Sequence, residues 1–108
     1  MSLTSEFEYN GNEFSGVVFT YSDEVVKMVF DGSGPSLEKT KELLRKFVDD
    51  AKAGNYATVK FVRGSSISTE SDDRVSFVVA KYEKTGSGYV DFSLPIDLCL
   101  PAFESLIQ

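Results

Sequence analysis

A single clear helix divides an otherwise strand-like chain into two halves. Between Ser36 and Gly54, side chains recur at helical spacing and form one stripe, made of Leu37, Thr40, Leu44, Phe47, Val48 and Ala51. Ser36 is a favourable residue to cap the start of this helix, and Gly54 is a favourable residue to end it. The pattern therefore predicts a helix over these residues, between two strand-rich segments.

Short runs of β-branched and aromatic residues lie on both sides of this helix. Asn10-Gly11 predicts a hairpin turn between residues 7–9 and a strand at 14–21, and residues 25–30 read as the next strand. After the helix we expect strands at 56–62, 74–84 and 89–94. A short terminal helix follows, in which Pro101 suits the first position. The polar residues 64–73 are expected to form a mobile loop.

These elements predict one α+β domain over residues 1–108. Its expected architecture is an antiparallel meander sheet with helices packed on one face, in the order β-β-β-α-β-β-β-α. The last strand and helix of each half share a hydrophobic pattern. A duplicated βββα unit and an ordinary α+β domain without duplication both explain that similarity.

Composition excludes several classes of function. The chain contains no histidine, so it cannot build a Ser-His-Asp triad, a Cys-His pair or a zinc-binding HExxH helix. Its one cysteine, Cys99, cannot form an internal disulfide and lies among leucines, where we expect a buried thiol. We therefore expect a non-enzymatic protein without metal or cofactor. The absence of an apolar leader or a long apolar run favours a cytoplasmic location.

Two further patterns favour structural roles. The loop 32–36 is rich in glycine but lacks the spacing of a dinucleotide-binding or P-loop motif, so it reads as a turn and a helix cap. The adjacent acids Asp23-Glu24, Asp49-Asp50 and Asp72-Asp73 do not converge on one substrate, because neighbouring side chains point in different directions.

Charge is distributed unevenly along the chain, whose net charge is −6. The segment before the helix carries six acidic residues and a single base, Lys27. The bases that follow the helix all lie on or beside two predicted strands, and two tyrosines lie among or near them. Because side chains alternate along a strand, several of these residues share one face. A basic face with interleaved aromatic rings is typical of surfaces that bind single-stranded nucleic acid. The candidate binding residues are Lys60, Arg63, Arg74, Lys81, Tyr82, Lys84 and Tyr89.

The second half resembles a known group of proteins. The runs ATVKFVRG, DRVSFVVAKYEK and GYVDFSLPIDLCLPAFESLIQ are similar to the strand, strand, strand, helix ending of the positive-cofactor-four, Whirly and PUR group of single-stranded-DNA-binding proteins. The resemblance implies a curved antiparallel sheet that binds single strands, with helices behind it and often a dimer. It would place phosphate contacts at Lys60, Arg63, Arg74 and Lys81.

Two functions remain open at this point. The first is a module that binds single-stranded nucleic acid through the basic face. The alternative is an acidic protein–protein interaction module, such as an inhibitor, an assembly factor or a small chaperone, whose N-terminal third meets a basic protein partner. A homodimer is also expected, because residues 94–107 carry more apolar side chains than a short terminal helix can readily bury.

Overall fold

The computed structural model describes the chain except residues 35, 62–63, 72 and 84–85, and residues 80–83 and 86–90 are described by their backbone. The described residues form an α+β fold, as the sequence predicts, with antiparallel strands and two helices. In chain order the elements are β1 (Ser2–Asn10), β2 (Glu13–Ser22), β3 (Lys27–Ser33), α1 (Leu37–Lys52), β4 (Thr58–Lys60), β5 (Ser66–Ser71), β6 (Arg74–Glu83), β7 (Gly86–Pro95) and α2 (Ile96–Ile107).

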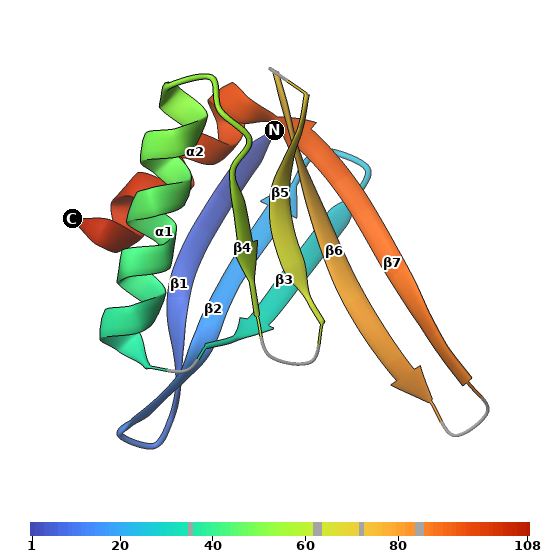
Figure 1. The fold of residues 1–108 in the computed structure, drawn as a ribbon. Coiled ribbons are helices and arrows are strands. Elements are labelled where there is room, and N and C mark those ends of the chain that lie inside the picture. The colour runs from blue at the N-terminus through green and yellow to red at the C-terminus, as the bar shows by residue number, and fades with distance from the viewer. Residues whose placement is uncertain (35, 62–63, 72, 84–85) are drawn as a thin grey trace.

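The strands divide into two antiparallel sheets. The N-terminal sheet has the order β1-β2-β3, and the C-terminal sheet has the order β4-β5-β6-β7. Each sheet is a meander, and each is followed by a helix, so the expected βββα pattern occurs twice with β4 added to the second half. Figure 1 shows the C-terminal sheet in front of the N-terminal sheet and both helices together on one side.

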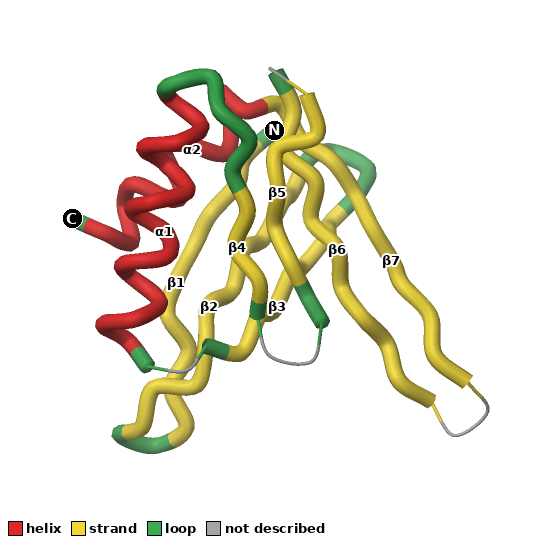
Figure 2. Tube along the Cα trace, viewed as in Figure 1, coloured by secondary structure: helices red, strands yellow, loops and turns green. Residues whose placement is uncertain are grey.

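Local signals account for the first half. The β1–β2 turn is Gly11-Asn12, one residue later than the predicted Asn10-Gly11, and Gly11 has φ +66°, a conformation that glycine adopts easily. Ser36 caps α1, since its side chain accepts a hydrogen bond from the Lys39 N–H at 3.1 Å. Gly54, with φ +78°, follows the end of α1. Figure 2 shows both helices and the loop that leads from the end of α1 to β4.

The prediction of a mobile loop at residues 64–73 is wrong for the central part of this segment, because Ser66–Ser71 form β5. This strand pairs with β4 on one side and β6 on the other. Serine is common in turns, which is why the segment reads as a loop. Here Ile67 is fully buried in the core, and the neighbouring strands satisfy the backbone of its polar residues.

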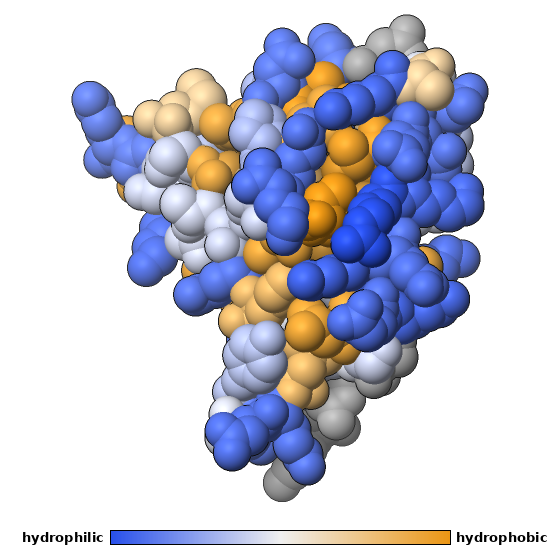
Figure 3. Space-filling view, turned by 90° about the vertical axis from the view of Figure 1, so that its left-hand side faces the viewer, coloured by the Kyte–Doolittle hydropathy of each residue, from blue (hydrophilic) through white to orange (hydrophobic). Residues whose placement is uncertain are grey.

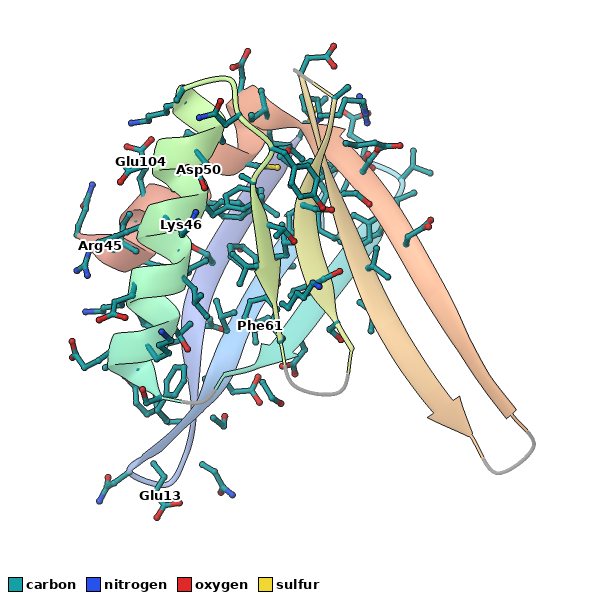
Figure 4. The ribbon with its side chains drawn as sticks, viewed as in Figure 1. Glu13, Arg45, Lys46, Asp50, Phe61 and Glu104 are labelled. Atoms are coloured by element: carbon teal, nitrogen blue, oxygen red, sulfur yellow. The ribbon has the colours of Figure 1, made fainter. Side chains whose placement is uncertain are left out.

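A cluster of phenylalanine rings joins the two sheets and both helices. Phe19 of β2 lies 5.8 Å from Phe77 of β6 and 4.8 Å from Phe103 of α2, measured between ring centroids. Phe103 also lies 5.0 Å from Phe47 of α1. Phe61, labelled in Figure 4, lies 5.5 Å from Phe30 and connects the end of β4 to the N-terminal sheet. Both halves of the chain therefore share one core.

The terminal helix begins five residues before the expected position. α2 starts at Ile96, and Pro101 lies inside it. Proline has a fixed φ that suits a helix and loses one backbone hydrogen bond there. Burial of the apolar stripe compensates, because Cys99, Ala102, Phe103 and Leu106 all lie in the core.

A dimer is expected from the sequence because residues 94–107 carry many apolar side chains, and the structure does not support this reason. The apolar side chains of this segment are buried or packed partly buried against the core of the same chain. Figure 3 shows the helix side of the molecule, where a narrow apolar band runs between hydrophilic side chains. Among the described residues, the large apolar side chains that are exposed lie elsewhere: Met1, Tyr9, Val25, Val26, Val29 and Tyr56. None of the helices in the described residues is both long and apolar enough to cross a membrane.

Candidate functional site

Among the side chains that the structure describes, the outer face of the C-terminal sheet carries two basic residues, Lys60 and Arg74, among hydroxyl groups. The ladder register aligns Lys60, Ser66, Val78 and Asp91 in one row across the sheet, and Thr58, Ser68, Ser76 and Ser93 in the next. Arg74 pairs with Pro95 one step further along β6. Paired residues in adjacent strands project to the same side of a sheet. We call this surface the serine face, defined by Thr58, Lys60, Ser66, Ser68, Arg74, Ser76, Val78, Asp91 and Ser93.

Alternation along the strands explains how this face arises. In β6 the side chains of Val75 and Phe77 are fully buried, so Arg74 and Ser76 project outward between them. In β4 the side chain of Val59 is buried while Lys60 is exposed. The same pattern that anchors the sheet to the core thus leaves hydroxyl and cationic groups in solvent.

Arg74 is held in place by its neighbour on β7. Its Nε donates a hydrogen bond to Ser93 Oγ at 3.0 Å, and its Nη2 donates to the Ser93 carbonyl oxygen at 2.8 Å. A guanidinium has five N–H donors, so three are left after these two bonds. Arg74 also lines a groove of about 460 Å³ between the β2–β3 turn and the junction of β7 with α2, together with Tyr21, Val26 and Leu94.

The structure brings together two of the seven predicted site residues. Lys60 and Arg74 are both exposed on the serine face, as the alternation predicts. Arg63 and Lys84 lie outside the described residues. Lys81 and Tyr82 in β6, and Tyr89 in β7, have backbone positions in the ladder, and their side chains lie outside the described part. Beyond Val78 no residue of β6 is paired with β5 in the described register, and residues 79–83 pair with β7 as a two-stranded ribbon.

Sequence reasoning missed a second surface on the other sheet. On the outer side of the N-terminal sheet, Glu6 pairs with Val18, which pairs with Asp31, and Glu8 pairs with Gly16. We call Glu6, Glu8 and Asp31 the acidic cluster. The spacing of Glu6 and Glu8 by two residues could have revealed part of it, because such residues share a strand face. Asp31 is distant in sequence and joins through the register.

The acidic cluster perturbs its own ionisation. Charge repulsion from Asp31 is the main cause that raises the pKa of Glu8, and partial desolvation and repulsion from Glu6 raise it further. Gly16, which pairs with Glu8, must be glycine, because a Cβ there would clash with the Gly32 carbonyl oxygen. The fold thus places carboxyl groups close together on an open sheet face.

Other reactive groups have structural environments. Burial raises the pKa of the Cys99 thiol to about 12, so it stays protonated, and the prediction that Cys99 is buried is confirmed. Asp23 is held by the β2–β3 turn: its carboxylate accepts hydrogen bonds from the Tyr21 hydroxyl and from the Val25 and Val26 N–H groups. Among the described residues, no group of three acidic or cysteine side chains is arranged to hold a metal ion.

Helix charges are arranged along the surface. Lys46 pairs with Asp50 along α1 at 2.9 Å, and Lys52 of α1 pairs with Glu104 of α2 at 3.1 Å. Figure 4 labels Arg45, Lys46, Asp50 and Glu104 on this side of the molecule, with Glu13 at the β1–β2 turn. Only the Lys52–Glu104 pair connects the two helices, and exposed pairs of this kind contribute little to stability.

Comparisons with known proteins identify a family to which this chain belongs. No curated protein and no solved structure matches the chain. A family model matches residues 27–105, from the start of β3 to the last turns of α2. Because this match covers more than half of the chain, the protein belongs to a family of unknown function, DUF5766.

Proposed function

We propose that the protein is a non-enzymatic binding protein that holds single-stranded nucleic acid on its serine face. The observation that carries the proposal is the exposure of Lys60 and Arg74 on one sheet face among Ser66, Ser68 and Ser76. Lysine and arginine contact phosphate oxygens through charge, and serine hydroxyls donate hydrogen bonds to the same oxygens. An exposed sheet surface with both groups suits an extended single strand.

The β6–β7 ribbon extends this surface in the proposal. Its backbone continues β6 and β7 beyond the last residue that pairs with β5, and its sequence contributes Tyr82 and Tyr89, whose positions alternate in step with Arg74 and Ser76. Lys81 falls at a position on the opposite face, so it is not part of the proposed surface. Tyrosine rings stack on bases, and their contribution does not depend on which base is present. The proposal includes a reducing compartment such as the cytoplasm, where a single unpaired cysteine is common.

The test is a titration of a fluorescent oligonucleotide of about 20 nucleotides at about 20 mM salt, repeated at rising salt concentrations. The doubly reversed variant Lys60→Glu/Arg74→Glu should lose most of the binding. For a single strand, a plot of log affinity against log salt concentration has a negative slope, and each lost phosphate contact should make that slope shallower by about 0.7. A matched control, Lys39→Glu/Arg45→Glu on the exposed side of α1, changes the net charge equally and should leave binding nearly unchanged.

A second variant separates the position of Arg74 from its charge. Ser93→Ala removes the hydroxyl that accepts from Arg74 Nε and keeps the carbonyl that accepts from Nη2. It should weaken binding modestly without changing the salt slope, because the charge remains. Wild-type protein that fails to bind at about 20 mM salt would overturn the proposal, since phosphate contacts are strongest there.

The acidic cluster favours a second candidate function. Glu6, Glu8 and Asp31 lie on an open face, and their mutual repulsion would be relieved by a cationic partner. In this alternative the protein is an acidic interaction module for a basic protein. Binding of a lysine-rich peptide that is lost in Glu6→Gln/Glu8→Gln, together with no binding of single strands, would favour it.

A further inference from the structure

β3 is an edge strand whose outer side has no partner strand in the described part of the chain. The N-terminal sheet ends at β3, and Figure 1 shows no strand of that sheet beyond it. Exposed edges can pair with another strand through their free backbone groups. The partner that fits this edge can be worked out from its hydrogen bonds and side chains.

The register shows which backbone groups are free. The Gly34 N–H donates to the Ser15 carbonyl at 3.2 Å, and the Asp23 N–H donates to the Val26 carbonyl at 3.0 Å. Both pairs belong to the same unshifted β2–β3 ladder. Hydrogen-bonded and non-bonded pairs alternate in an antiparallel ladder, so the even-numbered residues of β3 bond to β2. The N–H and C=O groups of Lys27, Val29 and Asp31 therefore point away from β2, toward the open edge of the sheet.

The side chains of these three residues form a symmetric pattern. Lys27, Val29 and Asp31 are all exposed, on the outer face of the sheet, and Val29 is 51% exposed. A positive charge lies two residues before the valine, and a negative charge lies two residues after it. Reversing the strand direction exchanges the two charges, so the edge is complementary to itself.

We propose that β3 pairs antiparallel with β3 of a second copy of this chain, about a twofold axis through Val29. Lys27 of each copy then lies opposite Asp31 of the other, and the two Val29 side chains meet at the centre. The free N–H and C=O groups of the three residues pair with the same groups of the second copy. The two N-terminal sheets become one continuous sheet of six strands, and the interface is isologous.

Two observations favour a second copy of this chain over a different, basic protein as the partner of β3. Self-pairing forms both Lys27–Asp31 contacts at once, and each brings a lysine to the acidic cluster, where Asp31 is close to Glu8. The exposed apolar side chains also gather near this edge, since Val25, Val26 and Val29 are among the largest exposed apolar residues described. Pairing would cover part of this surface.

Charge reversal tests the pairing, with mass measured by sedimentation over a range of concentrations. Wild-type protein should be a dimer at micromolar concentration. Lys27→Asp and Asp31→Lys should each weaken the dimer about tenfold or more, because like charges then face each other in both contacts. Mixing the two variants should restore association, since every contact between them joins opposite charges. The double variant Lys27→Asp/Asp31→Lys should also associate.

The control is Glu13→Lys, an exposed residue at the β1–β2 hairpin that lies outside the acidic cluster and is not on β3. It changes the net charge as much as Asp31→Lys does and should leave the dimer intact. Wild-type protein that stays monomeric at about 100 μM would overturn the inference, since specific dimers normally bind more tightly than this. A dimer that neither reversal weakens, or a mixture that does not associate, would also overturn it. The inference is independent of nucleic-acid binding, because the serine face belongs to the other sheet.

Discussion

Phe103 occupies the centre of the phenylalanine cluster, and truncating it should test the core directly. Its ring is fully buried and meets Phe19, Phe47 and Phe77 edge-on, at centroid distances of 4.8, 5.0 and 6.2 Å. Replacing a buried phenylalanine by alanine costs about 3–5 kcal/mol. Edge-on ring pairs each add about 0.5–1.5 kcal/mol beyond the buried area, which favours the upper part of that range.

We therefore expect Phe103→Ala to lower the free energy of unfolding by about 4–5 kcal/mol, a large share of the total stability of a small domain. The melting temperature should fall by on the order of 20 °C. Phe103→Leu keeps most of the apolar volume and loses the ring pairs, so its loss should be about 2 kcal/mol.

Urea titration followed by circular dichroism measures these losses, with Tyr56→Ala as the control. Tyr56 is 71% exposed, so its truncation should change stability by less than about 0.5 kcal/mol. A loss below about 1 kcal/mol for Phe103→Ala, with an unchanged urea dependence, would refute the assignment of this ring to a shared core.

Three further outcomes follow from single side chains. The buried Thr40 hydroxyl has no hydrogen-bond partner among the described residues, so Thr40→Val should stabilise the fold by about 1 kcal/mol in thermal unfolding, while Thr40→Ser should destabilise it. The hydrogen bond from Tyr21, followed by those from two backbone amides, lowers the pKa of Asp23, so its contribution to stability is present above the unfolded pKa and is lost as the pH falls through the folded value. Tyr21→Phe should raise the pKa of Asp23 in an NMR titration. The pKa of about 12 and the burial of Cys99 predict that a thiol reagent at pH 8 modifies it only after denaturant is added.

Local sequence signals predicted the elements whose geometry is set by a few adjacent residues. The hairpin predicted near Asn10-Gly11 and the helix that Ser36 caps and Gly54 follows are both confirmed, although the hairpin turn is one residue later, at Gly11-Asn12. These features depend on turn conformations and capping bonds within a few residues. The same reasoning failed for β5, because only Ile67 marks that strand as apolar and the strands beside it decide its burial.

The faces of the sheets needed information from distant residues. Alternation along β6 correctly placed Arg74 and Ser76 together, and two ladder registers brought Lys60 to the same side. The acidic cluster combines Glu8 with Asp31 across the intervening β2 strand. No short segment contains that pairing, since a shift of one residue in either ladder would move a carboxyl group to the opposite face.

The shared phenylalanine cluster has a consequence for how the chain can be divided. Phe19 and Phe30 come from the segment before the connection at residues 53–57, and Phe77 and Phe103 come from the segment after it. Either segment alone would expose its half of these rings to water, a cost that a single meander and helix cannot offset. A backbone cut in the connection would therefore give two fragments that remain unfolded separately and fold when they are mixed.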